Sequence, residues 1–205
     1  MISVTVLTKN SQRYIREVLA ALQSFNEVVV YDTGSSDETL SIAEQFSNVV
    51  LYKKPFVGFG PTHNLASEAA KNDWILSIDS DEVVTPEMTQ AIFRTPLDEN
   101  CVYSFPRNNY FNGKLIKWCG WYPDRQVRLY NRKRTRFSDT QVHEGVLREN
   151  VQTVLLNAPF KHYSYASISE FLEKMQLYSD LFAKQYAGKK SSSSFKAILH
   201  GFLRL

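Results

Sequence analysis

Two aspartates one residue apart, Asp79 and Asp81, are the side chains of this sequence best suited to chemistry. They follow an apolar run at 74–78 that is too short for a helix and rich in strand-forming residues. Two carboxylates held this close repel each other unless a cation or strong donors lie between them. The spacing therefore favours a divalent metal site, although Asp-x-Asp alone also fits a solvated acidic turn.

The elements that must position this pair can be predicted from the residues upstream. Apolar runs predict strands at 2–7, 28–31 and 49–52, ahead of the strand at 74–78. Helical signals lie between the strands, at 15–25, from a capping box at Ser35 through Phe46, and from Pro61 to about Asn72. Strands and helices that alternate at this spacing indicate a parallel sheet with right-handed crossovers.

The polar loops that follow these strands are expected to converge. The carboxyl ends of parallel strands meet at one edge of an open α/β sheet, and ligands bind there. The loops at 8–10, 32–36 and 60–64 should therefore lie beside Asp79 and Asp81. Helix N-termini at the same edge offer backbone N–H groups to an anion such as a diphosphate. A nucleotide diphosphate with a metal fits this site.

The pattern changes after a short helix at 85–94. Asn112-Gly113 predicts a hairpin, and further strands are expected at 101–105, 127–130 and 151–156, so antiparallel or mixed strands should extend the sheet. A helix with one apolar face starts at Ser167 or Ser169, and a linker at 189–194 precedes a basic amphipathic segment at 195–205. We predict a domain at 1–166, with halves at 1–95 and 96–166, and a helical extension at 167–205.

Composition narrows the class of protein. The 205 residues are 43% hydrophobic and 22% charged, as in ordinary globular proteins. No apolar run approaches the roughly 20 residues that span a bilayer, and the N-terminus lacks the features of a secretion signal, so a cytoplasmic protein with two reduced cysteines is expected. Segment 195–205 has the pattern of a helix lying on an anionic inner membrane, and a helix packed on the domain fits it equally well.

Two stretches resemble the signatures of a known family. Residues 28–39, Val-Val-Val-Tyr-Asp-Thr-Gly-Ser-Ser-Asp-Glu-Thr, and residues 74–82, Trp-Ile-Leu-Ser-Ile-Asp-Ser-Asp-Glu, resemble those of family 2 glycosyltransferases with the GT-A fold. Residues 58–64, 123–130 and 142–144 are similar to the WaaE/KdtX group of lipopolysaccharide core β-glucosyltransferases. The resemblance covers nearly the whole chain, but His63 stands where relatives often carry Lys or Arg.

The resemblance implies a fold and an activity. The fold would be α/β of the GT-A type, a Rossmann-like and mainly parallel sheet flanked by helices, with mixed or antiparallel strands in the second half and a C-terminal helical appendage. The activity would be inverting, metal-dependent transfer of a hexose, glucose from UDP-glucose, to a lipopolysaccharide inner-core acceptor. The implied partners are a nucleotide-sugar donor and a lipid-linked saccharide, with no nucleic acid.

The same resemblance assigns roles to individual residues. Asp79 would face ribose or metal, Asp81 would ligate Mg²⁺ or Mn²⁺, and His162 would point at the metal or diphosphate. Glu144 would be the general base. The remaining donor-binding residues would be Thr8, Asp32, Gly60, His63, Asn64, Ser80 and Arg128.

Several alternatives stay open at this point. Asp124 is a rival base, although a turn after Pro123 also explains it; His162 is also explained by a structural role, and Arg128 by solvent exposure. The acceptor is alternatively a polysaccharide, a lipid carrier or a peptide. A different class is an RNA-binding module built on the basic, aromatic segment 105–136, but that reading leaves Asp79 and Asp81 without purpose. The donor sugar, nucleobase, linkage and oligomeric state cannot be read from the sequence.

Overall fold

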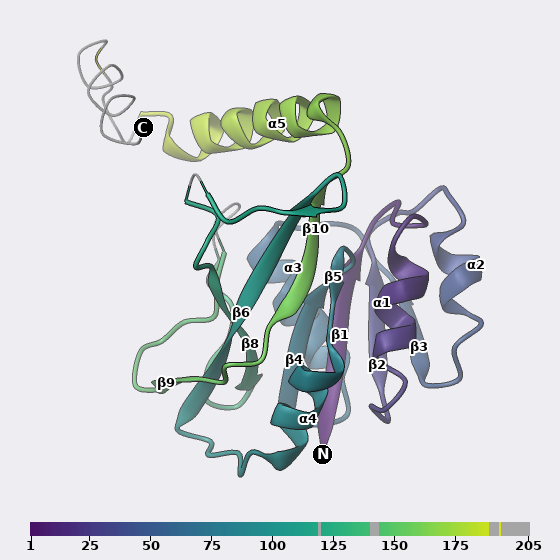
Figure 1. Cartoon of the computed structure of the whole chain (residues 1–205), viewed down its shortest axis with the longest axis vertical. Coiled ribbons are helices and arrows are strands. Elements are labelled where there is room, and N and C mark those ends of the chain that lie inside the picture. The colour runs from purple at the N-terminus through teal and green to yellow at the C-terminus, as the bar shows by residue number, and fades with distance from the viewer. Residues whose placement is uncertain (119, 140–143, 189–192, 194–205) are drawn as a thin grey trace.

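The computed structural model describes residues 1–118, 120–139, 144–188 and 193, and its centre is one curled mixed sheet (Figure 1). The first half supplies four parallel strands, β1 (Ile2–Thr8), β2 (Val28–Asp32), β3 (Val49–Lys53) and β4 (Trp74–Asp79). Between and after them lie α1 (Ile15–Ala21), α2 (Thr39–Ala43), α3 (Phe59–Ala69) and α4 (Pro86–Arg94). The predicted order of strands and helices is confirmed.

The core lies on both faces of this parallel sheet. Val28 and Val30 face a large cluster that also contains Leu19 of α1 and Met88 of α4. Val29, between them, faces a second cluster beneath the other surface. Strands covered on both faces need near-continuous apolar sequence, which explains why the apolar runs alone predicted them.

The register of the strands fixes one edge of the sheet. Thr8 is paired with Asp32, and Leu7 with Asp79, so the ends of β1, β2 and β4 coincide. Both carboxylates therefore arrive at the same edge as the loop after Thr8. This is the convergence that the sequence predicted.

The second half extends the sheet with strands of both directions. It contains β5 (Glu82–Val83), β6 (Cys101–Phe111), β7 (Lys114–Leu115), β8 (Arg125–Asn131), β9 (Gln152–Leu155) and β10 (Phe160–Tyr165). The strand order is β3-β2-β1-β4-β8-β6-β10-β5, with β7 and β9 also paired to β6. β8 runs antiparallel to both β4 and β6, whereas β10 runs parallel to β6. The predicted mixed half is confirmed.

Local signals succeeded where the chain turns tightly. Asn112 and Gly113 have φ values of 45° and 75° and join β6 to β7, as the hairpin signal predicted. Thr85 caps α4 by accepting a hydrogen bond from the backbone N–H of Met88. The capping box predicted at Ser35 is wrong, because the Ser35 hydroxyl donates to Asp32 and α2 begins only at Thr39.

The last described helix, α5 (Ile168–Tyr186), lies across the top of the molecule in Figure 1 and projects beyond the sheet. Ser167 caps it, as predicted, by accepting from the backbone N–H of Glu170 at 3.1 Å. Much of its predicted apolar face is exposed, Ile168 to 68% and Leu172 to 50%. The predicted segment at 195–205 lies outside the described residues, and within the described ranges no helix is long and apolar enough to cross a membrane. The division at residue 166 stays a prediction.

Candidate active site

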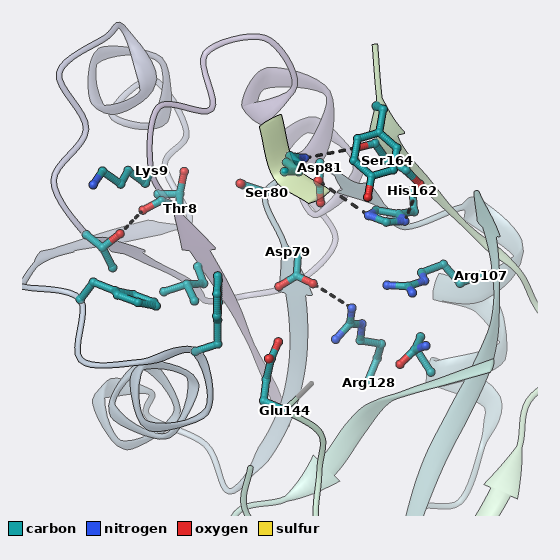
Figure 2. A pocket seen from close by; sticks show the side chains of 17 residues that line it. Thr8, Lys9, Asp79, Ser80, Asp81, Arg107, Arg128, Glu144, His162 and Ser164 are labelled. Atoms are coloured by element: carbon teal, nitrogen blue, oxygen red, sulfur yellow. Dashed lines mark hydrogen bonds and ion pairs between the residues drawn. The ribbon is translucent and has the colours of Figure 1, made fainter. Parts of the chain in front are cut away.

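A cavity of about 780 Å³ opens at the carboxyl ends of β1 and β4 (Figure 2). Seven predicted site residues line it: Thr8, Asp79, Ser80, Asp81, Arg128, Glu144 and His162. Five others are not part of its described lining: Asp32, Gly60, His63, Asn64 and Asp124. The structure therefore gathers most of the predicted site in one place and sets the remainder behind it.

Asp79 ends β4 and is fixed from the opposite half of the sheet. Because β8 pairs antiparallel with β4, Arg128 reaches across and donates through Nη2 to Asp79 Oδ2 at 2.9 Å and to Glu82 Oε1. Glu82 is fully buried, and its Oε2 accepts the backbone N–H of Asp79 at 3.2 Å. Burial raises the pKa of Asp79, but Arg128 and the neighbouring His63, His162 and Arg107 together outweigh this effect and leave that pKa below its usual value. Asp79 is thus an ionised carboxylate in a fixed position.

Asp81 has the opposite environment. Burial, and then repulsion by Asp79, raise its pKa to about 6. The nearest nitrogen partner is His162 Nε2, 3.7 Å from Asp81 Oδ2. Burial lowers the pKa of His162 to about 4, so the imidazole is neutral at pH 7. Asp81 therefore carries a charge at pH 7 that its surroundings, Lys174 and Arg107 included, compensate only in part.

The hydrogen bonds of His162 assign its tautomer. Nδ1 lies 2.6 Å from Asn109 Oδ1, while the amide nitrogen of Asn109 donates to Asp124 Oδ2 at 2.9 Å. Asn109 Oδ1 is therefore an acceptor, and His162 Nδ1 carries the proton. The lone pair is left on Nε2, which faces Asp81. A carboxylate or amide that fixes a histidine in this way is typical of metal-ligating imidazoles.

These residues fit a divalent cation in one particular manner. Among the described residues no group of three or more His, Cys, Asp and Glu side chains could hold a metal by itself. Mg²⁺ and similar ions at nucleotide sites commonly use one or two carboxylates and take their remaining ligands from phosphates and water. Asp81 with Nε2 of His162 supplies such an incomplete set, and a cation there would relieve the repulsion between Asp79 and Asp81.

His63 and Asn64 lie behind the cavity wall, on α3. His63 is 2% exposed, its ring stacks on Phe137 at 4.3 Å, and its Nε2 lies 3.6 Å from Asp79 Oδ1. Burial lowers its pKa to about 4, so His63 is neutral where a relative's Lys or Arg would be charged. The Asn64 side chain accepts from Phe137 N at 2.9 Å and donates to Phe137 O at 3.0 Å. Both residues therefore hold Phe137 in place, and Gly60 is buried in the first turn of the same helix.

Glu144 and Asp124, the two candidate bases, differ in their surroundings. Glu144 points into the cavity towards Asp79 and Arg128 (Figure 2), and it lies two residues before Val146, which forms an antiparallel bridge with Phe137. Asp124 Oδ2 accepts from Arg107 Nε at 2.7 Å and from Asn109, and its Oδ1 accepts from Gln126 at 2.7 Å. Burial raises the pKa of Asp124, but these donors outweigh it and the pKa is lowered. Asp124 thus holds the side chains of Arg107 and Asn109 in place and does not itself line the cavity.

Asp32 and Thr8 end adjacent strands but have different roles. The Asp32 carboxylate accepts from the backbone N–H groups of Gly34 and Ser35, both at 3.0 Å, and so orders its own loop. Thr33 lines the cavity in its place. Thr8 also lines the cavity, and its hydroxyl is buried and has no hydrogen-bond partner in the described structure.

A family model described as "Glycosyl transferase family 2" matches residues 3–153, which is most of the chain. The chain belongs to glycosyltransferase family 2. Its relatives include an uncharacterised glycosyltransferase of Rickettsia prowazekii, 31% identical over 213 residues that cover 94% of this chain and 70% of the relative. The lipopolysaccharide core biosynthesis glycosyltransferase LpsC of Rhizobium meliloti is 24% identical over 196 residues, which cover 90% of this chain and 71% of the relative.

Solved glycosyltransferase structures share the fold. Staphylococcus aureus TarS 1-349 in complex with UDP has a TM-score of 0.57 and 19% identity, and the match covers 89% of this chain and 65% of that one. The Pyrobaculum calidifontis mannosyltransferase PcManGT, in complex with GDP-Man and Mn²⁺, has a TM-score of 0.58 and 16% identity, covering 97% and 68%. The predicted GT-A fold of this glycosyltransferase is confirmed.

Sequence reasoning missed several residues of the glycosyltransferase site. Glu82 follows the Asp79–Asp81 pair directly, and its proximity was the only signal for its role. Arg107 lies in the basic segment 105–136, but nothing local indicated that it would pair with Asp124. Lys174 lines the cavity from α5, a helix whose sequence gave no indication of a site.

Proposed function

We propose that this family 2 glycosyltransferase is inverting and metal-dependent, and that it moves a hexose, glucose from UDP-glucose, to a lipopolysaccharide inner-core acceptor. The observation that carries the proposal is the asymmetric cavity. Asp81, whose charge is only partly compensated, lies beside His162 and Asp79, and a separate acid, Glu144, projects from another wall. LpsC, a relative named for lipopolysaccharide core biosynthesis, supports the acceptor class. TarS, whose similar structure contains UDP, supports a uridine donor.

The donor half of the cavity would bind the nucleoside diphosphate. Thr8 and the loop ordered by Asp32 would contact the nucleoside, Asp79 would face the ribose or the cation, and Asp81 with His162 would hold Mn²⁺ or Mg²⁺. Once bound, the cation would neutralise the charge that develops on the departing nucleoside diphosphate. Arg128 keeps Asp79 ionised and in place, so its two oxygens stay available to the donor without a rearrangement.

Glu144 would act on the acceptor. We assign it as the general base that takes the proton from the acceptor hydroxyl while the oxygen attacks the anomeric carbon. The new glycosidic bond forms as the bond to the diphosphate breaks, in one displacement that inverts the configuration. Asp124 is the weaker candidate, because three side chains already donate to it and it does not line the cavity.

The basic segment 105–136 supports a transferase over an RNA-binding module. Arg107 and Arg128 face buried carboxylates. Arg132 and Lys133 both pair with Asp73, and Arg136 pairs with Asp139 at 2.6 Å. Much of the positive charge that suggested an anionic polymer is therefore already paired with carboxylates of the protein itself. Peripheral membrane contact through segment 195–205 stays a separate prediction.

A donor panel tests the proposed function. Purified protein is incubated with UDP-glucose, UDP-galactose, UDP-GlcNAc, GDP-mannose or ADP-heptose, with Mn²⁺ or with EDTA, and hydrolysis and the melting temperature are measured. We expect UDP-glucose to give metal-dependent hydrolysis and the largest melting shift. Transfer is then measured with an inner-core oligosaccharide, and the anomeric configuration is read by NMR. Failure of every donor to bind, or activity that EDTA leaves unchanged, contradicts the proposal.

A further inference from the structure

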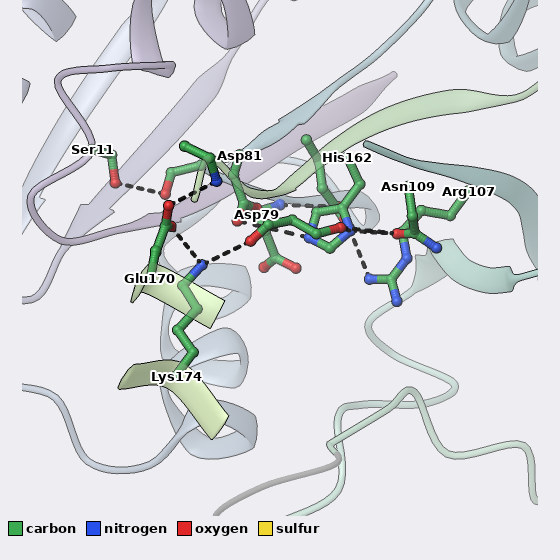
Figure 3. Close-up of polar contacts among 12 residues, drawn as sticks. Ser11, Asp79, Asp81, Arg107, Asn109, His162, Glu170 and Lys174 are labelled. Carbon is green, nitrogen blue, oxygen red and sulfur yellow. Dashed lines mark hydrogen bonds and ion pairs between the residues drawn. The ribbon is translucent and has the colours of Figure 1, made fainter. Parts of the chain in front are cut away.

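One side chain of α5 reaches back into the cavity. Lys174 lines the cavity together with Asp79 and Asp81, although the helix that carries it lies outside the catalytic sheet. Figure 3 shows its ammonium directed towards the Asp79–Asp81 loop. Helix α5 thus contributes a positive charge to a site whose other lining residues come from the sheet, its loops and α3.

Lys174 is held in this orientation by three contacts. Its Nζ donates to the backbone oxygen of Ser164 at 3.2 Å, lies 3.5 Å from Glu170 Oε1, and sits 5.2 Å from the centre of the Tyr165 ring. Glu170 is fixed in turn, because its Oε2 accepts the backbone N–H of Ala166 at 2.8 Å. The lysine is therefore presented by the first turns of α5 rather than left to solvent.

The anchor of Lys174 lies next to the candidate metal ligands. Ser164 follows His162 by two positions on β10, and the residue between them, Tyr163, donates its backbone N–H to the backbone oxygen of Asp81 at 2.9 Å. The same strand therefore carries His162 and the anchor of Lys174 and is bonded to Asp81. An anion bound to a cation at Asp81 and His162 would lie within this group.

The two guanidinium groups among the cavity's lining residues already pair with carboxylates. Arg128 pairs with Asp79 and Glu82, and Arg107 with Glu82 and Asp124. The carboxylate partner of Lys174 is instead Glu170, whose side chain is 36% exposed, and such pairs are weak. An ammonium has three N–H donors, so its contacts with Ser164 and Glu170 leave capacity for a further acceptor.

We propose that Lys174 binds the diphosphate of the nucleotide-sugar donor. This inference rests on the proposed function, and it makes α5 part of the donor site. A lysine ammonium is a common partner of phosphate, as a point charge rather than a bidentate fork. It would add to the stabilisation of the departing diphosphate from the part of the cavity that α5 lines.

A phosphate series tests the proposal. Affinities for uridine and UDP are measured by calorimetry in Mn²⁺ with wild type, Lys174→Met and Lys174→Arg. We expect Lys174→Met to weaken UDP about tenfold with uridine unchanged, since one charge-assisted contact is lost, and Lys174→Arg to stay within about threefold of wild type. Lys71→Met is the matched control, because Lys71 is 79% exposed and lies at the end of the sheet away from the cavity. It should match wild type.

Glu170→Gln separates phosphate binding from a structural role. It removes the charged partner of Lys174 but keeps the ammonium, so UDP affinity should be unchanged or higher. If Glu170→Gln weakens UDP as much as Lys174→Met does, Lys174 acts only by holding α5, and the proposal is wrong. An unchanged UDP affinity in Lys174→Met overturns it too, including when only the acceptor KM rises. Lack of UDP binding by wild type overturns the proposed donor together with this inference.

Discussion

Replacing Asp81 by asparagine should make the metal-free protein more stable while removing its response to metal. The pKa of Asp81 is about 6 in the fold, against 3.8 for the free residue, because burial and Asp79 both disfavour the charge. The folded protein therefore holds this proton more tightly than the unfolded chain. The stability that this provides is present at low pH and is lost as the pH rises through about 6.

The two pKa values set the size of the effect. Above pH 7 the ionised Asp81 costs the fold up to about 3 kcal/mol, and at pH 4.5 about 1 kcal/mol of that cost remains. Asparagine has a similar shape and no charge, so Asp81→Asn removes the cost. For a chain of this length each kcal/mol corresponds to roughly 2–4 °C in melting temperature. The melting temperature of the variant should exceed that of wild type by several degrees at pH 8, and by a much smaller difference at pH 4.5.

Scanning fluorimetry in EDTA at both pH values measures this difference. Asp180→Asn is the control, since Asp180 is exposed on α5 and its loss of charge should change the melting temperature little. Adding Mn²⁺ with UDP should then stabilise wild type and leave Asp81→Asn nearly unchanged, so that the order of the two proteins reverses. If Asp81→Asn is no more stable than wild type in EDTA at pH 8, the argument from repulsion fails.

Three further predictions concern the rest of the site. Glu144→Gln should lower turnover by about 10²–10⁴-fold with UDP affinity within a few-fold of wild type. Asp124→Asn should instead lower the melting temperature and keep turnover within about tenfold. The reverse pattern in steady-state kinetics would make Asp124 the base. Asp32→Ala should weaken UDP binding at least tenfold, about 1.4 kcal/mol. It should also destabilise the fold, because the backbone N–H groups of its loop lose their acceptor. Calorimetry that shows unchanged UDP affinity would remove Asp32 from the donor site. Asn64→Ala should lower the free energy of unfolding by about 1–3 kcal/mol in chemical denaturation, because both backbone groups of Phe137 lose their partner. An unchanged unfolding midpoint would show that this contact does not hold Phe137 in place.

The sequence predicted the parallel half well because local patterns determine it. Strands buried on both faces need continuous apolar runs, and a hairpin with two positive φ angles needs a pair such as Asn112-Gly113. The convergence of Thr8, Asp32 and Asp79 also followed from the rule that parallel strands end at one edge. These features depend on few residues each, all close in sequence.

Features that depend on distant partners could not be predicted. β10 is short, and its sequence, Phe-Lys-His-Tyr-Ser-Tyr, contains no apolar run, so only its pairing with β6 and β5 makes it a strand. His63 belongs to a segment typical of donor contacts, yet Phe137, from another part of the chain, covers it. Ser35 had capping spacing, but Asp32 competes for its hydroxyl. In each case a partner far away, or a stronger local acceptor, decided the outcome.

The shared register of β1 with β2 and β4 has a consequence for how this enzyme can diversify. Leu7 pairs with Asp79 and Thr8 pairs with Asp32, so β1 sets the relative position of the loops that follow both aspartates. Side chains alternate between the two faces of a sheet, so a slip of one residue would move every side chain of a strand to the opposite face. Insertions within these strands should therefore disrupt the site. The loops that follow these strands tolerate changes in length. Laboratory evolution of donor or acceptor preference should therefore succeed by varying loops after residues 9, 33 and 112, while the spacing of the two aspartates is inherited unchanged.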